Sequence, residues 1–204
     1  MTDIATIMRT SAVIPVLVID DIATAAPLAV ALVAGGLRVL EVTLRTPAAL
    51  DAIRAMRGVP GAIVGAGTVV NADQFAQVMD AGAEFIVSPG LTERLAQPII
   101  DSGVPFLPGV ANAGDIMLGM ELGLTHFKFF PAEANGGLKA LKTLAGPFYQ
   151  CRFCPTGGIT QASAPEWLAF DPVLCVGGSW VTPKAATMAE VQALAKAASS
   201  LKNQ

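Results

Sequence analysis

A lysine lies inside an apolar, phenylalanine-rich segment, His126-Phe-Lys-Phe-Phe130. An ammonium group is costly to bury in such surroundings, so a lysine there needs a partner or a function. Burial favours the uncharged amine, which can attack a carbonyl carbon and form a Schiff base. We therefore take Lys128 as a candidate nucleophile. The alternatives are a structural pair with Glu41 and a side chain that reaches solvent from the end of its strand.

Two further charged residues stand in the short segment Glu41-Val-Thr-Leu-Arg45. In an extended chain residues two apart share a face, so Glu41, Thr43 and Arg45 point the same way. The guanidinium group of Arg45 suits a substrate carboxylate, and the carboxyl group of Glu41 suits proton transfer. A simple Glu41–Arg45 ion pair would explain the same pattern. Thr68, at the end of a later apolar run, would add a hydroxyl donor.

Paired glycines end the last two apolar runs, at Gly157-Gly158 and at Gly177-Gly178, and Ser179 follows the second pair. Glycine permits the close backbone approach and the positive φ angles that an anion-binding turn needs. Two tight turns would require the same residues. The presence of both pairs favours a phosphate site.

A repeat of glycine indicates the elements that position these residues. Six glycines, spaced by 20 to 24 residues, each close an Ala/Leu-rich segment and precede a compact apolar run: Gly36, Gly58, Gly82, Gly103, Gly123 and Gly146. A helix that ends in a left-handed glycine before a strand explains this order. We also expect helix starts at Thr46, with Pro47 in the first position, and at Asn71. The expected strands are 14–18, 39–43, 62–66, 84–88, 105–108, 126–130, 151–155 and 173–176.

Eight alternations of apolar strand and helix predict an α/β fold with a parallel sheet covered by helices. A doubly wound open sheet and a closed (β/α)8 TIM barrel compete, and the regular count favours the barrel. At 204 residues with short connections, we expect one domain over residues 1–204. An open sheet would suit a dinucleotide, but Gly65-Ala-Gly67-Thr-Val-Val70 lacks the third glycine of that fingerprint. In a barrel the active site forms at the carboxyl ends of the strands.

Composition excludes several other classes of protein. The chain has 13 Lys and Arg against 16 Asp and Glu, a net charge of -3, and no basic cluster, so we expect no nucleic-acid partner. The longest uncharged stretch, residues 22–37, is shorter than the roughly 20 apolar residues of a membrane span. Asp3 and Arg9 interrupt any secretory signal. We therefore expect a cytoplasmic, soluble protein.

The cysteines and the single histidine predict packing rather than chemistry. Cys151 and Cys154 lie three apart in an expected strand, so they face opposite sides and suit neither metal chelation nor disulfide exchange. We expect these two and Cys175 to be core thiols, and His126 to pack or to form a hydrogen bond. With so few ligands, we expect no metal site.

Taken in order, the motifs resemble the 2-keto-3-deoxy-6-phosphogluconate (KDPG) aldolases, many of which also act on 4-hydroxy-2-oxoglutarate (KHG). The resemblance extends over nearly the whole chain. It is carried by Val13-Ile-Pro-Val16, Ala34-Gly-Gly36, Leu40-Glu-Val-Thr-Leu-Arg-Thr46, Val64-Gly-Ala-Gly-Thr68, Ser88-Pro-Gly-Leu91, Pro108-Gly109, Phe127-Lys-Phe-Phe-Pro-Ala-Glu133, Arg152-Phe-Cys-Pro-Thr-Gly-Gly158 and Val176-Gly-Gly-Ser179.

The resemblance implies a class I aldolase that acts on a phosphorylated keto acid without a metal or other cofactor. Lys128 matches the Schiff-base lysine, and Glu41 matches the general acid/base. The remaining matches are Arg45 and Thr68 for the pyruvate carboxylate, Pro89 beside the keto acid, and Gly157, Gly158, Gly178 and Ser179 for the phosphate. A homotrimer is also implied.

Two alternatives stay open at this point: an aldolase for the galactonate epimer of the substrate, and a non-catalytic phosphosugar-binding barrel. The acidic pair Asp20-Asp21 departs from some relatives, where basic residues occur. That departure puts in doubt a substrate contact from this loop.

Overall fold

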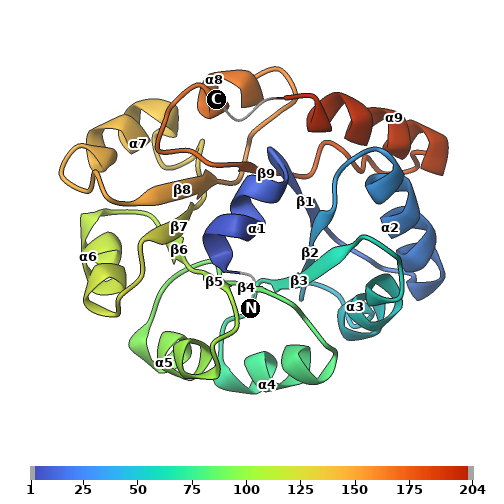
Figure 1. The fold of residues 1–204 in the computed structure, drawn as a ribbon, viewed down its shortest axis with the longest axis horizontal. Helices are drawn as coiled ribbons and strands as arrows, with labels where there is room; N and C mark the ends of the chain where they lie inside the picture. Colours follow the sequence, from blue (N-terminus) through green and yellow to red (C-terminus); the bar gives the residue numbers. More distant parts are fainter. Residues whose placement is uncertain (1–2, 202–204) are drawn as a thin grey trace.

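The fold is a parallel sheet that curls around a central interior and is surrounded by helices (Figure 1). A computed structural model describes residues 3–201. The strands are β1 (Val13–Leu17), β2 (Val39–Thr43), β3 (Ile63–Gly67), β4 (Ile86–Val87), β5 (Phe106–Leu107), β6 (Gly109–Val110), β7 (His126–Phe129), β8 (Arg152–Pro155) and β9 (Val176–Gly178). The helices are α1 (Ile4–Thr10), α2 (Ala25–Ala34), α3 (Ala49–Arg57), α4 (Ala72–Asp80), α5 (Glu93–Ser102), α6 (Ala113–Glu121), α7 (Gly137–Ala145), α8 (Ala164–Leu168) and α9 (Met188–Ser199), with a 3-10 turn η1 (Ile22–Thr24).

The strands pair in parallel throughout, as the alternation predicts. One sheet has the order β5-β4-β3-β2-β1-β9, and a second has the order β6-β7-β8. Only Pro108 separates β5 from β6, and single bridges, Phe153 to Val173 and Thr156 to Gly177, connect β8 with the chain around β9. The expected α/β architecture is therefore confirmed. The strand predicted over 105–108 is shorter in the structure: β5 ends before Pro108, which has no N–H to donate.

The core consists of two parts that the strands separate. The outer part packs strands against helices and contains Cys151 together with side chains such as Phe127 and Phe153. The inner part contains Cys154 and Cys175, and α1 closes it by adding Ile7 and Met8 at the amino ends of the strands (Figure 1). All three cysteines are free and buried, so the prediction of core thiols on opposite faces is confirmed.

Several element ends differ from the sequence predictions. Gly36, Gly82, Gly103 and Gly123 have the expected positive φ, but Gly58 and Gly146 end α3 and α7 with φ of -71 and -54. Asn71 caps α4 as predicted. Thr46 does not cap α3, which begins at Ala49. Its hydroxyl instead donates to the carbonyl of Ile19, which links the loops that follow β1 and β2.

Two further expectations concern single segments. His126 is partly buried, and its Nδ1 lies 3.1 Å from Oγ1 of Thr125, the kind of hydrogen bond expected for it. Across residues 3–201, none of the helices is both long and apolar enough to span a bilayer.

Candidate active site

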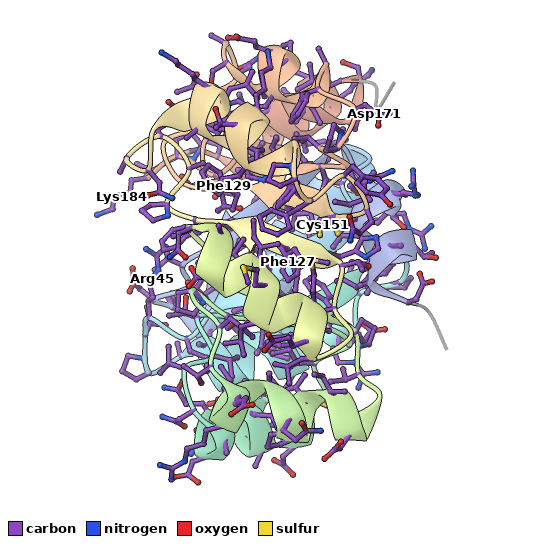
Figure 2. All side chains as sticks on the ribbon, turned by 90° about the vertical axis from the view of Figure 1, so that its left-hand side faces the viewer. Arg45, Phe127, Phe129, Cys151, Asp171 and Lys184 are labelled. Carbon is purple, nitrogen blue, oxygen red and sulfur yellow. The ribbon has the colours of Figure 1, made fainter. Side chains whose placement is uncertain are left out.

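The carboxyl ends of the strands gather on one side of the molecule. Arg45, which follows β2, and Lys184, which follows β9, lie on that side, whereas Asp171, which precedes β9, lies on the opposite side (Figure 2). This is the end at which polar residues are expected to form a site in a parallel, helix-covered fold.

Lys128 and Glu41 meet in the interior. Nζ of Lys128, on β7, donates to Oε1 of Glu41, on β2, over 2.9 Å. Their side chains are 7% and 3% exposed. A buried charge is tolerated when it is paired and hydrogen-bonded, and this pair satisfies that condition although 87 residues separate its members. The structure therefore places the predicted nucleophile within proton-transfer distance of the predicted acid/base.

A cavity of about 250 Å³ opens above this pair. Its size suits a small molecule rather than a macromolecule. It is lined by Val16, Glu41, Thr43, Arg45, Thr68, Pro89, Lys128, Phe130, Thr156, Gly157, Gly158, Ile159, Gly177 and Ser179. Every site residue predicted from the sequence is in this set except Gly178.

Two features of β3 shape the floor of the cavity. A Cβ atom at Gly67 would overlap the carboxylate of Glu41, so glycine at this position makes room for the acid. Thr68, directly after it, has a φ of 63, a left-handed conformation that costs free energy for a β-branched residue and tends to occur at functional sites. The chain therefore turns at Thr68, directly after β3, and Thr68 lines the cavity, where the sequence predicts a hydroxyl donor.

An aromatic ring and a thiol complete the surroundings of the pair. Nζ of Lys128 lies 5.4 Å from the ring centroid of Phe130, within the range of a cation–π contact. Burial raises the pKa of the Cys175 thiol well above its ordinary value, and the neighbouring Cys154 and the charge of Glu41 raise it further. Cys175 thus stays neutral, and the ionisable side chains that line the cavity are Glu41, Arg45 and Lys128.

Arg45 binds a threonine rather than Glu41. Its Nε donates to Oγ1 of Thr43 over 3.1 Å, while the carboxylate of Glu41 accepts from Lys128. The simple Glu41–Arg45 ion pair considered from the sequence is therefore not the arrangement found. The end of the Arg45 guanidinium remains available to an anionic ligand in the cavity.

The first glycine pair forms a turn that follows β8 and lines the cavity. Gly157 and Gly158 have φ of 103 and 83, conformations that strongly favour glycine. At the second pair it is Gly177 that lines the cavity, together with Ser179. Gly178 is buried in β9, where a Cβ would overlap the ring of Trp180.

No role was predicted from the sequence for five lining residues: Val16, Thr43, Phe130, Thr156 and Ile159. Val16 and Thr43 belong to β1 and β2, and the others follow β7 or β8. Their signal was position, because each lies near the carboxyl end of an expected strand. The acidic loop has a local role: Asp21 caps η1 by accepting from the amide of Ala23.

Comparison with known proteins distinguishes between the functions considered for this site. A family model described as "Aldolase: KDPG and KHG aldolase" matches residues 4–197. The chain belongs to the KDPG and KHG aldolase family. It is therefore an aldolase, a carbon–carbon lyase, and the non-catalytic barrel is excluded.

Individual members of the family are similar over almost their full length. The 2-dehydro-3-deoxy-phosphogluconate aldolase of Zymomonas mobilis is 60% identical over 99% of this chain and 98% of its own, and a crystal structure of the enzyme from that species, with 3-phosphoglycerate, has a TM-score of 0.97. The KHG/KDPG aldolase of Escherichia coli K12 is 56% identical over 89% of this chain and 86% of its own.

A third aldolase of the family carries a reaction intermediate. The crystal structure of the Legionella pneumophila KDPG aldolase, with pyruvate captured at low pH as a covalent carbinolamine, has a TM-score of 0.95 and 45% identity over 98% of this chain and 99% of its own. A carbinolamine forms when an amine adds to a carbonyl carbon, which is the first step of Schiff-base chemistry.

Proposed function

We propose that this aldolase cleaves KDPG to pyruvate and glyceraldehyde 3-phosphate, and KHG to pyruvate and glyoxylate, by a class I Schiff-base mechanism. The observation that carries the proposal is the buried 2.9 Å contact between Nζ of Lys128 and Oε1 of Glu41 at the floor of a small cavity. A nucleophile within hydrogen-bond reach of a base is the geometry that this mechanism needs.

The reaction begins at the C2 ketone of the substrate. Glu41 accepts a proton from Lys128, and the free amine attacks C2 to form a carbinolamine. Glu41 then returns a proton to the C2 oxygen, which leaves as water, and an iminium ion remains. The positive nitrogen is the electron sink for the next step, so the chemistry needs no metal ion as a Lewis acid.

Cleavage follows from the iminium. Removal of the proton from the C4 hydroxyl forms the aldehyde carbonyl and breaks the C3–C4 bond, whose electron pair becomes the enamine. Protonation of the enamine at C3 and hydrolysis of the imine release pyruvate and restore Lys128. Glu41, which already lies beside Nζ, is our candidate for these proton transfers.

The two anionic ends of KDPG bind at different walls of the cavity in this proposal. The carboxylate binds Arg45 and Thr68, with Pro89 packing against the keto acid, because a guanidinium fork matches carboxylate geometry. The phosphate binds the turn at Gly157 and Gly158. Ser179 and Gly177, at the end of β9, complete that subsite, and backbone amides and the Ser179 hydroxyl supply its donors.

We further propose that the strands occupy the eight positions of a closed (β/α)8 TIM barrel in a single domain. Two observations support closure: β5 and β6 are one residue apart, and bridges connect β8 with the segment at β9. The family resemblance supports a homotrimer. The free thiols suit a reducing compartment and support the cytoplasm as the site of action.

The substrate is tested by product analysis with purified protein. We expect kcat/KM for KDPG to exceed that for the galactonate epimer at least about tenfold, a difference of about 1.4 kcal/mol in the transition state, because the relatives described above are named for the gluconate form or for KHG. Removal of the substrate phosphate should raise KM. Faster cleavage of the epimer, or no pyruvate from KDPG, would contradict the proposal.

A further inference from the structure

Thr43, the last residue of β2, has no place in the reaction above, although its side chain lines the cavity. It is 1% exposed. Its Oγ1 lies 2.7 Å from the carbonyl oxygen of Leu17, at the end of β1, and 3.1 Å from Nε of Arg45. The hydroxyl therefore connects the neighbouring strand to the arginine that we assign to the substrate carboxylate.

The direction of both hydrogen bonds is fixed by chemistry. A carbonyl oxygen can only accept, so the single hydroxyl proton of Thr43 points to Leu17. The Nε–H of Arg45 can only donate, so it meets a lone pair of the same oxygen. Neither bond can reverse, and Oγ1 holds its position between the two partners.

This arrangement determines which part of Arg45 is free. With Nε bound to Thr43, the terminal nitrogens of the fork keep their N–H groups for a carboxylate. Arg45 itself is exposed, and a long exposed side chain loses rotamer freedom when it binds a ligand. The hydrogen bond to Thr43 already restricts Arg45 before the substrate arrives, so less rotamer freedom is lost on binding.

We propose that Thr43 is a positioning residue for the keto-acid subsite: it holds the Arg45 guanidinium in the orientation that receives the substrate carboxylate. The inference rests on the proposed function, because it requires Arg45 to bind that carboxylate. It predicts that the hydroxyl of Thr43 affects the affinity for pyruvate and KDPG and has little effect on the bond-breaking step.

The test uses the full-length variants Thr43→Val, Thr43→Ser, Arg45→Ala and the double variant Thr43→Val with Arg45→Ala. Two quantities are measured: the pyruvate concentration that gives half-maximal inactivation by borohydride, and the KM and kcat for KDPG. Thr43→Val should raise the half-saturating pyruvate concentration and KM about tenfold, since a hydrogen bond to a charged group is lost, with kcat within about threefold of the wild type. Thr43→Ser, which keeps the hydroxyl, should restore wild-type values.

The double-mutant comparison separates positioning from a general structural effect. In the Arg45→Ala background, Thr43→Val should change the half-saturating pyruvate concentration less than about twofold, because its partner is already absent. A full tenfold effect in that background, or a fall in kcat with KM unchanged, would overturn the proposal. Thr43→Ala serves as the second variant if Thr43→Val does not fold, with the same expected result.

Failure of the inference is distinguishable from failure of the proposed function. If Arg45→Ala leaves the half-saturating pyruvate concentration unchanged, the assigned role of Arg45 is wrong. If Arg45→Ala raises it and Thr43→Val does not, the role of Arg45 stands and the positioning role of Thr43 is wrong.

Discussion

At the scale of single residues, the proposed chemistry depends on two opposite charges, Lys128 and Glu41, that are almost completely buried. Removing water from an ammonium group and a carboxylate costs several kcal/mol each, and their contact returns that cost only with good geometry. The 2.9 Å hydrogen bond between Lys128 and Glu41 provides it. A buried pair that also forms the floor of a cavity is placed for function, since an apolar pair would have filled the interior without this cost.

Glu41→Gln tests the assignment of the acid/base. The amide keeps the size of the side chain and can still accept a hydrogen bond, but it cannot carry a proton. We expect kcat for KDPG cleavage to fall by about 10²- to 10⁴-fold, as measured by the rate of pyruvate release. The matched control is Glu121→Gln, at an exposed position at the end of α6, which should leave kcat unchanged. Retention of more than a tenth of the wild-type kcat by Glu41→Gln would contradict the role.

At the scale of elements, the glycine repeat predicted the alternation of helix and strand correctly, but glycines inside and outside the repeat serve different physical needs. Gly36 and Gly103 adopt positive φ at helix ends. Gly67 makes room for the Glu41 carboxylate. Gly35 has an ordinary φ of -79 and permits close packing of α2 on α9. The spacing of glycines in the sequence indicates where helices end. The physical reason for a particular glycine depends on contacts with elements that are distant in the sequence.

Gly35→Ala tests the packing requirement between α2 and α9. An added Cβ would lie 2.7 Å from the carbonyl oxygen of Gln192 and would overlap Cβ of Ala195. We expect the free energy of unfolding in urea to fall by about 1–3 kcal/mol, the usual cost of overpacking.

The matched control for that variant is Gly58→Ala at the end of α3. A Cβ there lies 3.4 Å from the carbonyl oxygen of Ala55, an ordinary contact, and the φ of -71 suits alanine. The free energy of unfolding of Gly58→Ala should stay within about 0.5 kcal/mol of the wild-type value. Equal losses in the two variants would mean that the α2–α9 contact is not the cause.

At the scale of the whole molecule, the site exists because the sheet curls. Its lining residues run from Val16 to Ser179 and come from strands on all sides of the interior. Lys128 and Glu41 could be selected from the sequence because charge inside an apolar strand is rare. The contact between Thr43 and Arg45, and the choice of Gly177 over Gly178 at the cavity wall, depend on strand register and side-chain direction, which the linear pattern does not specify.

The global stability should depend on the protonation of His126, the only histidine in the chain. Burial lowers the pKa of His126, and the nearby charge of Arg152 lowers it further. The imidazole of His126 therefore binds a proton more readily in the unfolded chain than in the folded one. The stability that neutral His126 contributes is complete above its unfolded pKa of about 6.5 and is lost as the pH falls below that value.

His126→Gln should remove this part of the pH dependence. Between pH 8 and pH 5.5, the free energy of unfolding should fall less in His126→Gln than in the wild type, as measured by urea denaturation at each pH. Arg152→Gln should give an intermediate change, because burial still lowers the pKa of His126. An identical pH dependence in the wild type and His126→Gln would show that the histidine titrates alike in the folded and unfolded states.

We expect Lys128 to form the Schiff base. The measurement is direct: the protein is incubated with pyruvate, reduced with borohydride and digested, and the modified peptide is located by mass spectrometry. The expected result is a stable adduct on Lys128 alone, which Lys128→Met abolishes together with KDPG cleavage. An adduct on another lysine, no adduct in the wild type, or loss of activity on addition of a metal chelator would contradict it.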